Sequence, residues 1–341
     1  MATCALISFR LGGVDGVSIE AAKWADSLEA LGHRVRLIAG RGGENVNIVN
    51  GLDLYDNNEV DETALGKALD GIDVVIVENM LSLPINARAS RAVARHLQGR
   101  RAIIRHHDLA TDRADTKWWW PPPNDDAWQH VAIAPPVATA LHDVGISSSV
   151  LWNHFDLAPP HMTREGARRY LDIAQDDLLF LQPTRAIPRK NIDQSLQIAE
   201  SFGATYWLTG PAEDNYQTHL DELIAHSRVP VRRGIDPDPI ATAYAACDLV
   251  LLPSTREGFG NPIVESIAQR RPLVLGHFPV AQCLREMGFH FLDPDDTGQI
   301  AAWLKEPKSQ ALEANYALAR PLFDITNLPT RLAELLSTLD L

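Results

Sequence analysis

The chain has 341 residues, of which 45% are hydrophobic and 22% charged, a composition typical of a soluble globular protein long enough for two domains. Its formal net charge of −13, with no concentrated basic run, argues against nucleic acid or anionic lipid as a partner. There is neither an apolar run long enough to span a bilayer nor a signal peptide, so we expect a cytoplasmic protein. The three cysteines are widely separated and are expected to be buried thiols.

The N-terminal half alternates strand and helix patterns. An apolar run at 3–9 leads into a loop with Gly12 and Gly13, and apolar residues at helical spacing follow over 17–31. Further strands are predicted at 34–39, 73–78, 102–107, 130–134 and 148–152, and further helices at 61–69, 84–98 and 136–144. Strands that alternate with helices predict a parallel, doubly wound sheet.

A polar, proline-containing stretch at 153–160 is the predicted domain boundary, and a second series of strands and helices follows it. Its strands are predicted at 178–182, 205–209, 248–252, 272–275 and 288–292, and its helices at 163–172, 191–202, 216–227, 239–246, 261–269 and 296–305. Two tail helices, 308–321 and 328–339, are punctuated by Pro321 and Pro329. We therefore predict two Rossmann-like α/β domains, 1–155 and 156–341, facing a cleft, with the last helix able to pack back on the first domain.

One segment, 117–128, fits neither element type because its prolines forbid a helix or a central strand. It contains four tryptophans, among them Trp118, Trp119 and Trp120. Two interpretations stay open: a lid or sugar-stacking surface, and a hydrophobic loop packed onto its own domain.

The most informative motif follows the apolar strand at 248–252 and reads Glu257-Gly-Phe-Gly-Asn261, with Glu265 further on in the next helix. A glycine-bearing loop before a helix brings backbone N–H groups close to an anionic ligand. Two carboxylates around such a loop suit a ligand that also carries hydroxyl groups. The motif therefore predicts a site for a nucleotide-sugar.

A basic loop with Arg185, Arg189 and Lys190 follows the strand at 178–182. From the carboxyl end of that strand, Arg185 and Lys190 could reach one pyrophosphate and stabilise its charge as a leaving group. A solvated basic loop is the alternative interpretation.

Together, Arg185-x4-Lys190 and Glu257-x7-Glu265, each after a strand of the second series, resemble the retaining GT-B glycosyltransferases of family 4, also called glycosyl transferases group 1. The resemblance covers essentially the whole chain in element order and length. It implies a hexosyltransferase with an N-terminal acceptor domain and a C-terminal donor domain. The donor would be a nucleoside-diphosphate sugar of the UDP-glucose or GDP-mannose type.

The resemblance also implies site residues. Arg185 and Lys190 would bind the diphosphate, Glu257 the hydroxyls of the transferred sugar, and Glu265 the ribose hydroxyls. The remaining donor-binding positions would be the backbone N–H groups and close-approach glycines at Gly12, Gly13, Gly258, Phe259, Gly260 and Asn261.

A histidine beside the reacting sugar is a further feature of the family, and His107 is its match here. His106 is one residue out of phase, and strand alternation would place the two rings on opposite sides. A histidine that merely satisfies its neighbours is the alternative. Asp108 is expected to orient His107, contact the acceptor or cap a local turn.

The acceptor is less defined than the donor. The sequence around Arg10 and His107 is similar to that of transferases that build small soluble glycosides such as glycosylglycerates, so a glycerate-type or sugar acceptor is expected. Arg10, Arg105 and Arg113 would serve a carboxylate on such an acceptor if they face the cleft. Because Glu265 would contact only ribose, UDP, GDP and ADP donors stay open.

We expect no cofactor and no metal. The diphosphate is a good leaving group, so positioning and electrostatic stabilisation should suffice, with retention by return of the acceptor proton to the leaving phosphate. Asp236-Pro-Asp238 and Asp293-Pro-Asp295 are interpreted as turns.

The sequence argues against three alternative functions. The loop Gly12-Gly-Val-Asp-Gly16 does not fit the fingerprint of a nicotinamide-dependent dehydrogenase. An epimerase of the same fold would need acids beside the sugar ring, which the sequence does not identify. A non-catalytic nucleotide-sugar-binding protein is disfavoured by intact donor motifs. The oligomeric state stays open.

Overall fold

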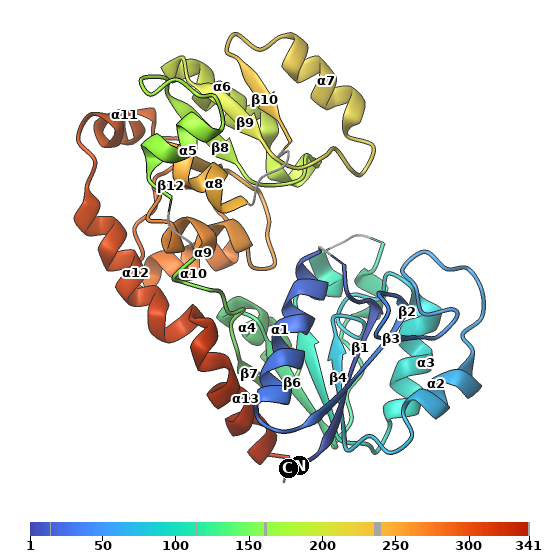
Figure 1. The fold of residues 1–341 in the computed structure, drawn as a ribbon. Helices are drawn as coiled ribbons and strands as arrows, with labels where there is room; N and C mark the ends of the chain where they lie inside the picture. Colours follow the sequence, from blue (N-terminus) through green and yellow to red (C-terminus); the bar gives the residue numbers. More distant parts are fainter. Residues whose placement is uncertain (14, 113–114, 160–161, 235–239, 340–341) are drawn as a thin grey trace. The chain divides into compact units, whose positions relative to one another are not determined.

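The computed structural model describes residues 1–13, 15–112, 115–159, 162–234 and 240–339. Their contacts divide the chain into an N-terminal unit, Met1–His154 with Thr326–Leu341, and a C-terminal unit, Phe155–Ile325 (Figure 1). The division falls at the start of the predicted boundary stretch. The second predicted domain extended to residue 341, whereas the tail from Thr326 belongs to the N-terminal unit. This is the packing that the prediction allowed for the last helix: the buried leucines of α13 (Leu328–Ser337) lie beside α1 (Gly16–Ala30).

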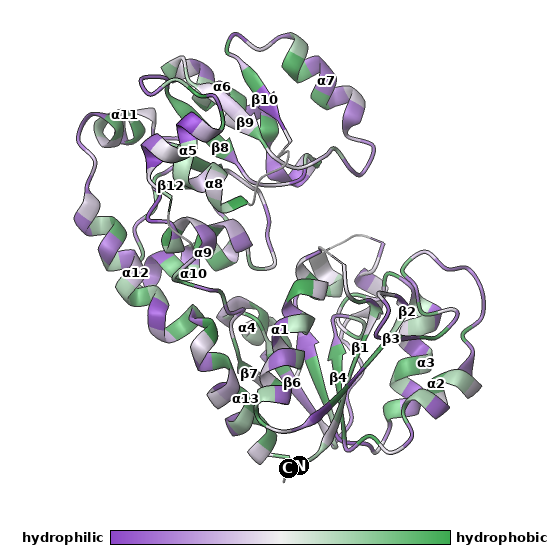
Figure 2. Ribbon diagram, viewed as in Figure 1, coloured by the Kyte–Doolittle hydropathy of each residue, from purple (hydrophilic) through white to green (hydrophobic). Residues whose placement is uncertain are grey.

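The N-terminal unit contains a seven-stranded parallel sheet in the order β3-β2-β1-β4-β5-β6-β7. The strands are β1 (Thr3–Arg10), β2 (Arg34–Arg41), β3 (Val46–Ile48), β4 (Val74–Glu78), β5 (Ala102–His106), β6 (Trp128–Ala132) and β7 (Ser148–Val150). The other helices are α2 (Glu62–Ala68), α3 (Ala87–Leu97) and α4 (Pro135–His142). β4 is buried along its whole length and is mostly hydrophobic in Figure 2, as expected for a central parallel strand covered on both faces.

The C-terminal unit contains a five-stranded parallel sheet in the order β10-β9-β8-β11-β12. The strands are β8 (Leu179–Gln182), β9 (Thr205–Leu208), β10 (Val231–Arg233), β11 (Leu249–Leu252) and β12 (Leu273–Leu275). The helices are α5 (Arg164–Tyr170), α6 (Ile192–Phe202), α7 (Gln217–Ala225), α8 (Ile240–Ala246), α9 (Asn261–Ala268), α10 (Pro279–Glu286), α11 (Thr297–Lys305) and α12 (Ser309–Phe323). Two parallel α/β sheets confirm the predicted fold class.

Several local predictions were wrong. The edge strands β3 and β10 and the helix α10 were missed, since two three-residue strands and a short polar helix give little periodic signal. The predicted strand at 288–292 contributes only an isolated bridge between Leu292 and Val274. Pro321 lies inside α12 and does not end it.

The tryptophan-rich segment packs largely onto its own unit. Trp119 lies against the core cluster of the sheet, and its indole donates to the carbonyl of Leu81 at 2.7 Å. Trp120 packs against a second cluster, while Trp118 is 54% exposed. For Trp119 and Trp120, this arrangement agrees with the interpretation as a packed loop.

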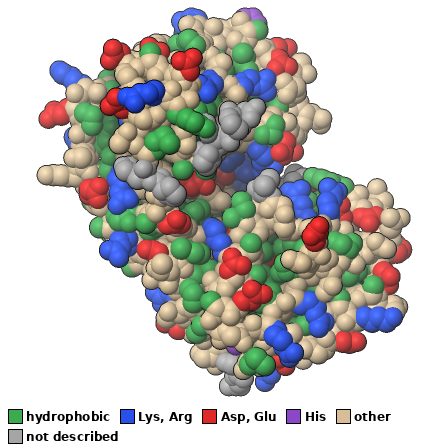
Figure 3. Space-filling view, viewed as in Figure 1, with side chains coloured by type: hydrophobic (Ala, Val, Ile, Leu, Met, Phe, Trp, Pro, Cys, Tyr) green, Lys and Arg blue, Asp and Glu red, His purple; other side chains and the backbone are tan. Residues whose placement is uncertain are grey.

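On the face of the molecule shown in Figure 3, acidic and basic side chains are interspersed over each unit. In the described part of the chain, none of the helices has the length and apolar character needed to cross a membrane.

Candidate functional site

The donor motifs of the C-terminal unit lie at the carboxyl ends of neighbouring strands. β8 and β11 pair in parallel, so the loops that follow them leave the same edge of the sheet. The loop after β8 contains a 3-10 turn, Pro188–Lys190, and the loop after β11 leads into α9. The N–H of Thr255 donates to the carbonyl of Arg189 at 2.9 Å and joins the two loops. The sheet order therefore brings together two motifs that are far apart in the sequence.

Glu257 lies between two cations where these loops meet. One carboxylate oxygen pairs with the Lys190 ammonium and the other with the Arg189 guanidinium. The side chains of Glu257 and Lys190 are only 5% and 8% exposed, whereas that of Arg189 is 30% exposed. Burial alone would raise the pKa of Glu257, but the charges of Lys190 and Arg189 hold this pKa below its ordinary value. Arg189 was predicted only as part of the basic loop; its pairing with Glu257 was missed.

Arg185 does not join this cluster directly. Its guanidinium pairs at 2.5 Å with Glu213, which follows β9, and both side chains are nearly half exposed. The two loops are held together by backbone hydrogen bonds between Ala186 and the segment that contains Glu213. Arg185 is still near enough for its charge to act on Lys190. Glu213 was missed because nothing in the sequence links it to Arg185.

Glu265 lies one turn inside α9 and is half-buried. The hydroxyl of Tyr244, on α8, donates to Glu265 Oε2 at 2.6 Å. Burial raises the pKa of Tyr244 well above its ordinary value, so the phenol keeps its hydrogen and orients the carboxylate. Tyr244 is another contact that the sequence did not reveal.

The predicted donor-binding loop residues differ in their surroundings. The Phe259 side chain is buried between Phe155 and Phe323, with ring centroids 5.9 and 5.8 Å away, so only its backbone is open to a role in binding. Gly260 has φ +92°, a conformation that favours glycine, and immediately precedes the first residue of α9, Asn261. In the first turn of α9, Pro262 has no N–H and the N–H of Ile263 donates to the carbonyl of Gly260 at 2.8 Å, which leaves the N–H of Asn261 at the start of the helix.

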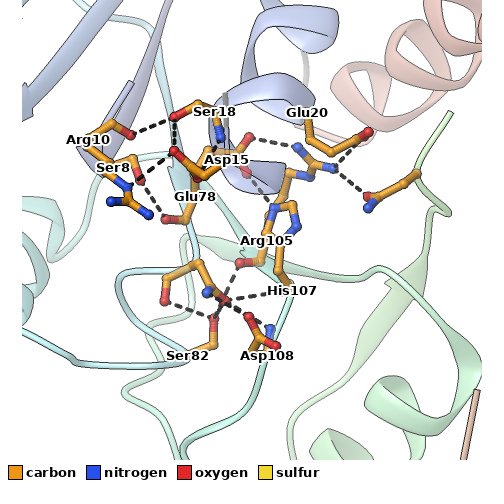
Figure 4. Close-up of polar contacts among 12 residues, drawn as sticks. Ser8, Arg10, Asp15, Ser18, Glu20, Glu78, Ser82, Arg105, His107 and Asp108 are labelled. Carbon is orange, nitrogen blue, oxygen red and sulfur yellow. Dashed lines mark hydrogen bonds and ion pairs between the residues drawn. The ribbon is translucent and has the colours of Figure 1, made fainter. Parts of the chain in front are cut away.

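In the N-terminal unit, a second cluster lies at the carboxyl ends of β4 and β5 (Figure 4). Glu78 ends β4 and is paired in register with Arg105 on β5. Arg105 Nη1 donates to Glu78 Oε1 at 2.8 Å, and His107 Nε2 lies 2.7 Å from Glu78 Oε2. Burial would raise the pKa of Glu78, but Arg105 and the hydrogen bond from His107 keep it lowered. Glu78 had been interpreted only as a strand residue.

Arg105 was predicted to contact the acceptor, and its position contradicts that prediction. The side chain has no exposed surface. Its guanidinium lies 3.9 Å from the centroid of the Trp24 ring and donates to Asn153 at 3.4 Å. A cation held in this way cannot reach a small acceptor; it holds Glu78 in place instead.

His106 and His107 point to different sides of the strand, as the alternation predicts. His106 is fully buried, and its Nε2 lies 2.8 Å from His130 Nδ1 in a stacked pair. Burial lowers the pKa of His106 well below its ordinary value and that of His130 to about 4, so both rings are neutral. His107, which contacts Glu78, is the histidine left for a site.

Asp108 contacts Asn79, and its hydrogen bonds do not include His107. Asn79 Nδ2 donates to the Asp108 carboxylate at 3.3 Å, and Asn79 Oδ1 accepts the backbone N–H groups of His107 and Asp108 at 3.2 and 3.0 Å. Asn79 has φ 64°, which asparagine tolerates better than most residues. Of the predicted roles for Asp108, orientation of His107 is therefore indirect, through Asn79.

Arg10 ends β1, in register with Arg41 at the end of β2. Arg10 pairs with Asp15 at 3.2 Å and Arg41 with Asp53 at 2.5 Å, and their side chains are 39% and 66% exposed. Arg41 was not singled out in the sequence, because its position beside Arg10 depends on strand order.

Gly12 and Gly13 are exposed in the loop after β1. Gly12 has φ +75°, and a Cβ there would lie 3.2 Å from the backbone nitrogen of Gly43. The two glycine loops therefore approach each other closely at this edge of the sheet. Two predictions lie outside the described residues: Arg113 and the Asp236-Pro-Asp238 turn.

Asp293 and Asp295 lie at the surface near His277, with candidate ligand atoms of all three within 4.8 Å of one another. Asp293 is 3.2 Å from His277 Nε2. These partly exposed groups could hold a cation, which makes a chelator control necessary in binding experiments.

Residues 163–310, most of the C-terminal unit, match the family of glycosyl transferases group 1. Together with the relatives below, this match identifies the chain as a glycosyltransferase. Mannosylglucosylglycerate synthases of Petrotoga mobilis and Thermotoga maritima are each 25% identical to it, over 81% of this chain and 82% and 81% of their own lengths. The structure of Anabaena HepE in complex with UDP-glucose is similar with a TM-score of 0.78 at 19% identity, covering 99% of this glycosyltransferase and 100% of HepE. This likeness confirms the predicted GT-B fold.

Proposed function

We propose that this glycosyltransferase moves a hexose, with retention, from a nucleoside-diphosphate sugar to a hydroxyl of a small glycerate-type glycoside. The observation that carries the proposal is the cluster of Lys190, Arg189 and Glu257 beside the N-terminus of α9. It combines cations for a diphosphate with a carboxylate for sugar hydroxyls. The UDP-glucose complex of HepE supports a donor of this class.

The donor would enter by exchange of ion-pair partners. A diphosphate can accept hydrogen bonds from Lys190 and from Arg185 after the latter leaves Glu213, and Glu257 then turns to the hydroxyls of the sugar. Glu265, held by Tyr244, would accept the ribose hydroxyls. These contacts would stabilise the charge that develops on the leaving diphosphate.

The reaction would break the bond between the anomeric carbon and the diphosphate and form the bond to the acceptor oxygen on the same face. The acceptor proton would pass to the leaving phosphate oxygen. No protein acid is needed because the diphosphate leaves as an anion. His107 would lie beside the reacting sugar and contact a hydroxyl.

Arg10 and Arg41 support an acceptor with a carboxylate. Their adjacent, exposed guanidiniums lie at the same edge of the sheet as His107, two and three strands away in the order β2-β1-β4-β5. At about 4.8 Å per strand, this separation is about 10 to 14 Å. A one-sugar glycoside of a hydroxy acid has about this length. The name of the two similar proteins, mannosylglucosylglycerate synthase, agrees with this acceptor class.

Calorimetry with UDP, GDP and ADP, with and without a chelator, tests the donor site. Lys190→Ala should weaken nucleotide binding by about 1–3 kcal/mol through loss of charged hydrogen bonds. Arg189 still pairs with Glu257 in this variant, so the fold should survive. Lys305→Ala, on α11, is the control. Unchanged nucleotide affinity in Lys190→Ala would contradict the assignment of Lys190 to the diphosphate site.

A screen of UDP-, GDP- and ADP-sugars for slow hydrolysis, then for transfer to glycerate and glucosylglycerate, tests the reaction. Glu257→Ala should reduce donor hydrolysis more than it weakens binding of the free nucleotide. Binding without hydrolysis or transfer would favour the non-catalytic alternative, and a change of sugar configuration without transfer would favour an epimerase.

A further inference from the structure

We propose that Glu78 is a positioning residue that holds His107 in the neutral tautomer with hydrogen on Nε2, so that Nδ1 accepts a hydrogen bond from a hydroxyl of the bound substrate. The proposal rests on the proposed function for the place of His107 beside the reacting sugar. The fully buried Glu78 carboxylate would thus decide which ring nitrogen of His107 donates a hydrogen bond and which one accepts.

Because Glu78 is a carboxylate, its hydrogen bond with His107 can run in only one direction. An ionised Glu78 can only accept, so the hydrogen at the 2.7 Å contact belongs to His107 Nε2. Arg105 occupies the other oxygen of Glu78 at 2.8 Å and fixes the plane of the carboxylate. Glu78 therefore cannot rotate away from His107 without breaking its hydrogen bond with Arg105.

Glu78 belongs to a set of ion pairs in the interior of the unit. Glu78 is paired with Arg105, and Glu20, which is 1% exposed, is paired with Lys23. Arg105 Nη2 lies 3.9 Å from Glu20, so the four groups form one set with two charges of each sign.

The free nitrogen of His107 is accessible. In the described part of the chain, Nδ1 of the neighbouring His106 is buried without a hydrogen-bond partner, but Nδ1 of His107 is not among such atoms. No hydrogen bond from a described residue reaches His107 Nδ1, so this atom keeps a small exposed area, although His107 as a whole is only 5% exposed. Asn79 holds the backbone N–H of His107 at 3.2 Å and limits movement of the ring.

Nitrogen-15 NMR of the histidine rings tests the tautomer without any substrate. At about pH 8, above the usual histidine pKa of about 6.5, wild-type His107 should show hydrogen on Nε2 and an unprotonated Nδ1. Assignment comes from the signal lost in His107→Asn. Hydrogen on Nδ1, or on both nitrogens, in the wild-type protein would overturn the proposal even if no Glu78 variant folds.

Glu78→Gln should change the His107 tautomer and lower kcat by about 10- to 100-fold, with KM for the donor changed less than about threefold, because orientation is lost and donor contacts are kept. Glu78→Asp, which keeps the charge, should recover part of this loss. The matched control is Asp73→Asn, the same acid-to-amide change at the opposite end of β4, where Asp73 accepts the N–H of Thr3 at 2.7 Å. It should leave the tautomer and kcat unchanged.

Folded Glu78→Gln with unchanged histidine signals and unchanged kcat would contradict the proposal. The protein could instead show the expected tautomer but neither hydrolyse nor transfer any donor sugar. That result would support the contact between Glu78 and His107 and contradict the proposed function. The two failures are therefore distinguishable.

Discussion

Each unit has a buried carboxylate held by two basic side chains at the carboxyl ends of its strands, but the two clusters differ in access. Around Glu78, both the acid and Arg105 are 0% exposed, whereas Glu257 has a neighbour, Arg189, that is 30% exposed. A cluster that opens to the surface can exchange partners with an anionic ligand. A closed ion pair such as Glu78–Arg105 can only fix the geometry of its neighbour His107. The comparison thus separates a ligand-binding arrangement from a supporting one.

The largest expected effect is on stability and tests whether the Glu78 cluster is closed. Arg105→Met should lower the free energy of unfolding by about 3–5 kcal/mol, because Glu78 and Glu20 lose their shared cation inside the unit. Lys190→Met should cost only about 1–3 kcal/mol, because Arg189 stays paired with Glu257. Urea unfolding followed by tryptophan fluorescence measures both, since Trp24 lies against Arg105. Equal losses would mean that the two clusters are equally closed.

The second prediction concerns the free energy of unfolding at acidic pH. The pKa of His130 is lowered by burial to about 4 in the folded N-terminal unit, against about 6.5 when unfolded. Between these values the unfolded chain binds more protons, so stability should fall as the pH drops from about 6.5 to 4, by about 2–3 kcal/mol. The described histidines of the C-terminal unit are exposed.

Unfolding free energies measured across this pH range in wild type and in His130→Gln check this prediction. The variant should show a flatter dependence on pH, because glutamine does not titrate. Parallel curves would show that His130 does not set the acid sensitivity. Below this window, both units should lose the stability that the lowered pKa values of Glu78 and Glu257 provide, since protonation removes their ion pairs.

The sequence pointed to Lys190 and Glu257 of the loop cluster, whereas in the strand cluster it pointed to Arg105 and His107 and missed Glu78, which joins them. Lys190 and Glu257 stand in glycine- or proline-bearing segments after apolar runs, where side chains of this kind signal a ligand. Glu78 ends an apolar run and has no such surroundings. Its pairing with Arg105 depends on the neighbouring positions of β4 and β5, which hydrophobic periodicity does not specify.

The same limit explains why the sequence analysis chose Arg105 as a candidate for acceptor binding, whereas the structure favours Arg41. Arg105 lies inside the predicted strand 102–107 and Arg41 two residues after the predicted strand 34–39, so the pattern did not show which arginine is exposed. Burial decided between them: Arg105 belongs to a central strand next to α1 residue Trp24, and Arg41 stands near the sheet edge with its side chain 66% exposed. Long element patterns were predictable, and contacts between elements were not.

The smallest effect on stability is expected for the half-exposed ion pair between Arg185 and Glu213, beside the C-terminal cluster. Arg185→Ala and Glu213→Ala should each change the free energy of unfolding by less than about 1 kcal/mol, because the ion pair they form is nearly half exposed. Their effects on nucleotide affinity should have opposite signs. Arg185→Ala removes a cation from the diphosphate site, whereas Glu213→Ala frees Arg185 from a competing carboxylate and should leave binding equal or tighter. Calorimetry with UDP distinguishes the two. If both variants weaken binding equally, the pair is a structural contact between the loops, and the ability to exchange partners would then belong to Lys190 and Arg189 alone.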